Sequence, residues 1–165
     1  MTPIERAKSM FLNVPSEVFE AFLVPLIGDV GWPFHTIHDS TRGTAWIRLL
    51  GELSLKEFSN LRWNIYTLSL NKDILDPVSY GDIQLLIRDH VQGIETPLRR
   101  YVMNSKTRFL WHVKYIQGAG RLVAPIIMVV TFNGLRILDG IHRTAALFAL
   151  GFHGKIPIKA WIGSF

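Results

Sequence analysis

One short stretch of the chain combines residue types that together would hold a phosphate group. It reads Asp139-Gly140-Ile141-His142-Arg143 and leads into an Ala- and Leu-rich segment that Gly151 ends, so it predicts a turn followed by a helix. Backbone N–H groups in the first turn of a helix lack intrahelical partners, and the helix dipole places partial positive charge there. With a guanidinium and an imidazole added, these donors would converge on one anion.

We expect the residues of this turn to have separate tasks. Arg143 and His142 would neutralise phosphate charge, and Gly140 would let the backbone approach the ligand closely. Asp139 would cap the helix, and in a phosphotransferase it would also hold Mg²⁺ or act as a base. A simpler interpretation, which the local pattern supports equally, is a capped helix whose Arg143 reaches solvent or pairs with Asp139.

Charge is distributed unevenly along the chain. From residue 99 onward there are ten basic residues and one acid, a formal charge of +9, while residues 1–98 carry −4, which together give the net +5. Such asymmetry favours an anionic partner for the second part, although a basic surface neutralised by the acidic part across a fold interface would give the same count. The candidate nucleic-acid phosphate contacts are Arg99, Arg100, Lys106, Arg108, Lys114 and Arg121.

Aromatic residues alternate with these charges. Tyr101, Phe109, Trp111 and Tyr115 are of a type that stacks on bases, although helical spacing favours Phe109 as a core residue. This combination is typical of a nucleic-acid interface.

The elements that would position the turn follow from periodicity and breakers. Helical patterns cover residues 16–23, 54–66, 79–90 and 107–117, with Ser16 as an N-cap, a capping box from Ser54 to Glu57, and Gly118 after the last helix. Residues 125–132 are apolar and rich in β-branched residues, which predicts a buried strand. Asn133-Gly134 is a hairpin signal, so residues 135–138 are expected to form the second strand of the hairpin. Residues 156–162 are a last strand, in which Pro157 suggests an edge or a strand start.

This order predicts an α+β fold in a single domain, residues 1–165. Residues 1–98 would form a mainly helical acidic part, and residues 99–165 a basic part with a small mixed sheet flanked by helices.

Residues 107–162 resemble the ParB/sulfiredoxin superfamily. Its members share the order found here: a helix at 109–116, a glycine turn at 118–120, the strand at 125–132, the hairpin, the return strand, the turn at 139–143, the helix at 144–150, Gly151 and the strand at 156–162. The resemblance implies a nucleotide-phosphate site at the turn, with His142 and Arg143 on phosphate and ATP and Mg²⁺ as cofactors. The nucleotide-binding residues it predicts are Gly140, Ile141, His142, Arg143 and Thr144.

Departures from the family pattern reduce the number of activities that the resemblance allows. Sulfiredoxins carry cysteine where this chain has Ile141, and the chain contains no cysteine, which excludes sulfinic-acid reduction. Chromosome-partition ParB proteins carry Gly-Glu-Arg-Arg and a helix-turn-helix domain that this sequence lacks. The motif looks closest to the Asp-Gly-His-His-Arg form of the free-serine kinases, and in outline is similar to plasmid fertility-inhibition members, a group associated with ATP hydrolysis and DNA cleavage.

Three functions therefore remain as hypotheses. The first is an ATPase or small-molecule kinase, with a second carboxylate from Asp82, Asp89 or Glu95. The second is a nucleic-acid-binding protein or DNase, and the third is a non-catalytic interaction module. We expect a cytoplasmic protein, which the absence of cysteine fits. We also expect no membrane span, because the longest apolar run is far shorter than the roughly 20 residues a span needs. His35 and His38 form a weak metal-like pair.

Overall fold

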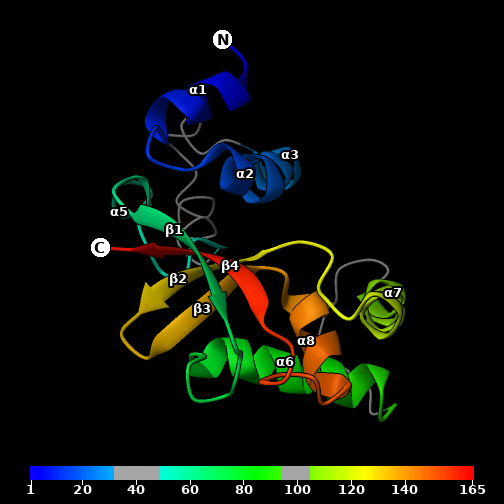
Figure 1. Cartoon of the computed structure of the whole chain (residues 1–165). Coiled ribbons are helices and arrows are strands. Elements are labelled where there is room, and N and C mark those ends of the chain that lie inside the picture. Colours follow the sequence, from blue (N-terminus) through cyan, green and yellow to red (C-terminus); the bar gives the residue numbers. More distant parts are fainter. Residues whose placement is uncertain (32–48, 94–104) are drawn as a thin grey trace.

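A four-stranded mixed sheet lies at the centre of the molecule, with helices around it (Figure 1). The structure is a computed structural model that describes residues 1–31, 49–93 and 105–165. The strands are β1 (Arg62–Leu68), β2 (Ile126–Thr131), β3 (Gly134–Asp139) and β4 (Ile158–Ser164). Their order is β1-β4-β2-β3, with β1 antiparallel to β4, β4 parallel to β2, and β2 antiparallel to β3. The expected α+β class with a small mixed sheet is confirmed.

Two groups of helices build two cores. The first group consists of α1 (Pro3–Met10), α2 (Ser16–Val18), the π-helical turn η1 (Phe19–Leu23), α3 (Val24–Val30) and α5 (Leu55–Ser59). The second consists of α6 (Pro77–His90), α7 (Ser105–Ala119) and α8 (Ile141–Ala149). No helix in the described part of the chain is both long and apolar enough to cross a bilayer.

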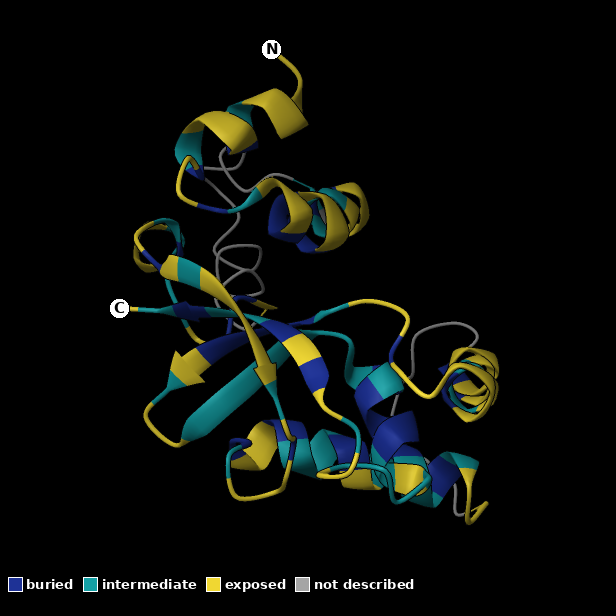
Figure 2. Cartoon of the chain, viewed as in Figure 1, coloured by how far each residue is buried: buried dark blue, intermediate teal, exposed yellow. Residues whose placement is uncertain are grey.

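The alternation of side chains along β2 separates the two cores. Ile127 and Val129 belong to the core of the first helix group, whereas Ile126 and Met128 belong to the core of α6, α7 and α8. Successive side chains of a strand point to opposite faces, so a strand with both faces covered is apolar throughout. This is why the run of apolar residues in β2 lacks polar alternation, and Figure 2 shows most of this strand buried.

The prediction of one helix over residues 54–66 is confirmed at its start and wrong after Ser59. The capping box is present, since the side chains of Ser54 and Glu57 each accept from the other's backbone N–H. The helix ends at Ser59, however, and the following residues form β1, the edge strand that pairs with β4. A capping box marks where a helix begins and carries no information on its length. The segment after it is rich in aromatic and β-branched residues that favour a strand when a neighbour is present.

The predicted hairpin is confirmed, but its turn is displaced. Thr131 pairs with Gly134, so Phe132 and Asn133 form the turn, and of the pair Asn133-Gly134 only the glycine has positive φ. The Thr131 hydroxyl donates to the Gly134 carbonyl oxygen over 2.7 Å. A Cβ on Gly134 would lie about 3.0 Å from the Ile74 carbonyl oxygen. Gly134 is therefore required where residues 74–76 pass against the hairpin.

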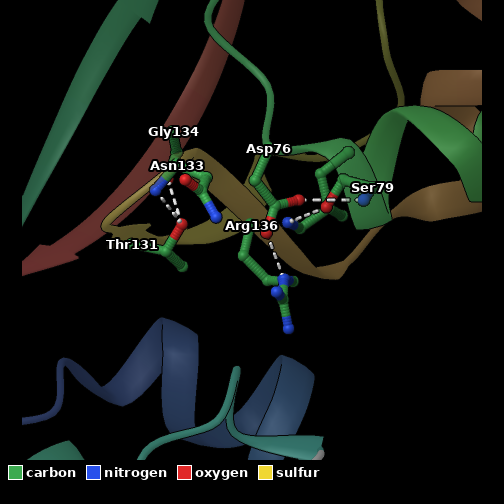
Figure 3. A network of polar contacts seen from close by, with 7 residues as sticks. Asp76, Ser79, Thr131, Asn133, Gly134 and Arg136 are labelled. Atoms are coloured by element: carbon green, nitrogen blue, oxygen red, sulfur yellow. Dashed lines mark hydrogen bonds and ion pairs between the residues drawn. The ribbon is translucent and has the colours of Figure 1, made fainter.

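A buried polar network fastens α6 to this hairpin (Figure 3). Asp76 caps α6 by accepting from the Ser79 backbone N–H, and its other carboxylate oxygen pairs with the Arg136 guanidinium of β3. The Ser79 hydroxyl accepts from the Ile137 backbone N–H over 2.8 Å. The Asp76 side chain is only 1% exposed, so this ion pair is shielded from water. The network fixes α6 against β3 and thereby the end of β3, where the predicted turn begins.

Two smaller expectations need correction, and a third is confirmed in one of its two forms. Ser16 is the first helical residue and Pro15 takes the cap position. The helix predicted to end before Gly118 continues to Ala119, and Gly120, at φ +68°, follows it. Of the two interpretations of Pro157, the strand start is confirmed and the edge strand is wrong: Pro157 directly precedes β4, which is an interior strand. A residue before the ladder does not need an N–H donor, so proline is tolerated there.

Candidate functional site

The predicted phosphate-binding turn joins the end of β3 to the start of α8. Asp139 is the last residue of β3, Gly140 occupies the N-cap position at φ +100°, and α8 begins at Ile141. The expectation that Asp139 caps the helix is wrong, because the cap residue immediately precedes the first helical residue and Asp139 lies one position too early. No side chain in the described ranges caps α8. The first intrahelical bond is donated by the Thr144 N–H, so the three N–H groups before it have no acceptor within the helix.

Arg143 folds back over the turn. Its Nη2 donates to the Pro125 carbonyl oxygen over 2.6 Å and to a carboxylate oxygen of Asp139 over 3.2 Å. A Cβ on Gly140 would lie 2.9 Å from the guanidinium carbon, so glycine is what allows this approach. The Arg143 side chain is 12% exposed, and its buried Nε has no hydrogen-bond partner among the residues that the structure describes. The pairing of Arg143 with Asp139, one of the two sequence-based interpretations, is what the structure shows.

His142 points into the protein instead of toward solvent. It is 9% exposed, and its Nε2 lies 2.8 Å from the Ser105 hydroxyl, which lies 3.0 Å from Nε2 of His90. A hydroxyl has one proton, so it donates to one imidazole and accepts from the other. These three residues link α6, α7 and α8 at the side of the turn.

The environment of His142 keeps its imidazole neutral. Burial lowers its pKa to about 4, with the positive charge of Arg108 and the neighbouring His112 and His90 acting in the same direction. At neutral pH His142 therefore adds no positive charge to the turn. The positive charge there comes from arginine side chains.

A cavity of about 170 Å³ opens beside this helix start. Its walls include the turn itself together with Arg108 and His112 from α7. Arg108 is exposed and forms no ion pair within the described residues. Burial and the charges of Arg143 and Arg108 lower the pKa of His112 to about 4, while Asp139 opposes the shift. The cavity is thus bordered by two arginines, one carboxylate and neutral imidazoles.

Thr144 does not belong to this cavity. It is fully buried and its hydroxyl donates to the Gly140 carbonyl oxygen over 2.7 Å, so its predicted contact with a nucleotide finds no support in its position. Gly140, Ile141, His142 and Arg143 all line the cavity.

A second cavity, of about 240 Å³, also borders Arg143. Asp139, Arg143 and Pro125 line it together with Glu17 of α2 and Trp161 of β4. Glu17 accepts from the Trp161 indole N–H over 3.1 Å. This carboxylate shares a cavity with Asp139 although 122 positions separate the two in the sequence, a proximity that no sequence signal revealed.

The other predicted acids lie elsewhere. Asp82 and Asp89 are on α6, half-buried and buried respectively, and line neither cavity. Glu95, and the histidines His35 and His38, lie outside the described residues. Within the described ranges no group of three His, Asp or Glu side chains is placed to hold a metal ion.

The turn carries donors of the kind that bind an anion. Uncapped N–H groups and an exposed arginine are what a phosphate needs. Asp139 pairs with Arg143 through one carboxylate oxygen, and Glu17 accepts from Trp161 through one of its own.

The predicted nucleic-acid contacts are partly brought together. Lys106, Arg108 and Lys114 are exposed on α7, and Arg121 is exposed just after it. Phe109 is fully buried in the core and cannot stack on a base, as its spacing indicated. Trp111 and Tyr115 stack on each other, with ring centroids 5.3 Å apart and planes 17° apart. Arg99, Arg100 and Tyr101 lie outside the described residues.

No protein-family model, curated protein or solved structure matches this chain.

Proposed function

We propose that the chain binds a nucleoside triphosphate, ATP in the first instance, through phosphates held at the Gly140–Arg143 turn. Hydrolysis or phosphoryl transfer would follow from that binding, as in the ParB/sulfiredoxin-like ATPases and kinases that the motif resembles. The observation that carries the proposal is the uncapped start of α8, which opens beside a cavity bordered by Arg108 and Arg143.

The energetics of this helix start support an anionic ligand. Cations in a first helical turn are unfavourable by roughly 0.3–1 kcal/mol each, and here Arg143 occupies that turn with no acidic side chain capping it. Asp139 relieves part of this through its ion pair. A phosphate would accept from the open N–H groups and offset the charges of Arg108 and Arg143 together.

Within the described residues no group of three His, Asp or Glu side chains is placed around a metal position. Mg²⁺ would therefore arrive with the nucleotide, bound to its phosphates, to water and to one or two carboxylates. Phosphate charge would then be neutralised by arginine, and the neutral His142 would hold the turn against α7. These assignments differ from the expectation that imidazole and guanidinium share the charge.

Thermal melting with and without Mg-ATP tests the proposal directly. At a ligand concentration 100 times the Kd, binding stabilises the native state by about 2.7 kcal/mol, a rise in Tm of roughly 5–10 °C for a protein of this size. Arg108→Ala, which changes an exposed side chain and leaves the fold intact, should reduce the rise, and Arg143→Ala should abolish it.

The matched control is Lys155→Ala, which removes an exposed cation beyond the other end of α8. It should keep the full ATP-dependent rise. Absence of any rise in the wild type overturns the proposal. Release of inorganic phosphate from Mg-ATP, measured on the same proteins, decides whether the bound nucleotide is turned over.

Nucleic-acid binding or cleavage is the second candidate, and the basic exposed face of α7 specifically favours it. Lys106, Lys114 and Arg121 would contact phosphates along a strand. Binding to a single-stranded oligonucleotide should then weaken as salt is added. For each phosphate that the protein neutralises, the logarithm of the association constant should fall by about 0.7 for every tenfold rise in salt concentration. A Lys106→Ala/Lys114→Ala variant should lose this binding while retaining the ATP-dependent rise in Tm.

A further inference from the structure

A large aromatic side chain lies exposed on α7. Trp111 is 52% exposed, although tryptophan usually buries most of its surface. The residues that anchor α7 in the core are Ser105, Phe109 and Ile116, so the helix does not need Trp111 for packing. Tyr115 stacks on the indole with its ring plane almost parallel, and the pair forms an aromatic surface on α7.

This aromatic surface adjoins the cavity at the start of α8. The imidazole of His112 packs edge-on against Trp111, with ring centroids 5.0 Å apart and planes at 89°, and the same His112 lines the cavity. Arg108, which also lines the cavity, precedes Trp111 by three residues and thus lies on the same side of the helix. A ligand in the cavity therefore has the indole one side chain away.

We propose that Trp111, braced by Tyr115, is the platform on which the base of a nucleotide stacks while its phosphates occupy the Gly140–Arg143 turn. This inference rests on the proposed function and identifies the base as the part of the ligand that adds affinity beyond the phosphates. The proposed site combines residues of α7 with the turn at the start of α8. The α7 residues are Arg108, Trp111, His112 and Tyr115.

The chemistry of the surface favours a base over an apolar group. A nucleobase is a flat π-system that stacks on indole, and a guanidinium beside such a stack adds a cation–π contribution. Stacking does not depend on the hydrogen-bonding edge of the base, because every base has a π-face. The platform therefore predicts a nucleoside triphosphate site with little preference among bases.

Calorimetric titration of the full chain with two probes, ATP and inorganic tripolyphosphate, separates the base from the phosphates. The wild type should bind ATP more tightly than tripolyphosphate. Trp111→Ala should weaken ATP binding by about 5- to 150-fold, the range expected for one stacked base, and leave tripolyphosphate binding unchanged. Trp111→Phe should recover much of the loss, and Leu110→Ala, an equally exposed neighbour, should change neither affinity.

The outcomes distinguish this inference from the function on which it rests. Equal loss of ATP and tripolyphosphate binding in Trp111→Ala, or no loss of either, overturns the platform while the phosphate site stands. Binding of neither probe to the wild type overturns both. GTP and CTP affinities within a few fold of ATP support stacking, and a strict preference for one base contradicts it.

Discussion

Between pH 7 and pH 5 we expect folding to lose about 2 kcal/mol through a single imidazole, that of His142. Burial, with help from Arg108, lowers its pKa from 6.5 to about 4 in the folded chain. Below pH 6.5 the unfolded chain takes up a proton at this residue, whereas the folded chain does so only near pH 4. Each pH unit in that window costs about 1.36 kcal/mol, so the loss is about 2 kcal/mol at pH 5 and at most about 3 kcal/mol at pH 4.

Stability falls with falling pH because the folded state holds the imidazole in its neutral form, so protonation favours the unfolded chain. The contribution of the imidazole is fully present above pH 6.5, declines as the pH falls toward 4, and is constant below that value. Urea unfolding followed by tryptophan fluorescence at pH 7, 6 and 5 measures the change in unfolding free energy, to which His112, whose pKa is also lowered to about 4, adds a loss of the same sign.

His142→Gln isolates this residue. The amide does not titrate and can still bond to the Ser105 hydroxyl, so the variant should be less dependent on pH by about 2 kcal/mol over the same interval, whatever its stability at pH 7. Lys155→Gln, an exposed change beyond the other end of α8, should keep the wild-type dependence. The reasoning is refuted if the wild type and His142→Gln lose the same free energy between pH 7 and pH 5.

Two further predictions concern the elements that hold the turn in place. Arg136→Ala leaves the buried Asp76 carboxylate without its cation and should cost about 3–5 kcal/mol in urea unfolding. The double variant Asp76→Asn/Arg136→Met should be more stable than Arg136→Ala, and equal or lower stability would show that the ion pair is not what Arg136 contributes. Gly51→Ala and Gly93→Ala both place a side chain at positive φ, but only at position 51 would the new Cβ lie 2.8 Å from Val129 Cγ2, whereas nothing lies within 4 Å at position 93. Melting temperatures should therefore show Gly51→Ala as the less stable by about 1–3 kcal/mol, and equal losses would mean that Val129 moves aside without cost.

Local signals predicted the elements around the turn well. The apolar run before it, the hairpin and the helix after it depend on neighbours in sequence, and each is present in the structure. The α+β class followed from their order. Local signals failed where a partner from far away decides the outcome, as at residues 62–68, which become a strand because β4 lies beside them.

Side-chain partners at the turn were beyond the reach of the sequence. The spacing of Asp139 and Arg143 allowed an ion pair or a bound anion equally, and the approach of the Pro125 carbonyl to Arg143 selected the folded-back guanidinium. His142 was expected to contact the phosphate. Its Nε2 is instead hydrogen-bonded to the Ser105 hydroxyl, because α7 packs against α8. Glu17 comes next to Asp139 only through packing of α2 on the sheet.

The sequence by itself determined which segments would be helix, strand and turn in residues 105–165, because propensity, capping and hairpin chemistry act over a few residues. It also determined that the basic residues are concentrated from residue 99 onward, but not where they lie in space. Only the tertiary structure decided that Gly140 caps α8, that His142 is buried and neutral, and that Trp111 lies exposed beside the cavity. Those properties depend on burial and on the fields of residues brought together by folding, and both are absent until the helices pack against the sheet.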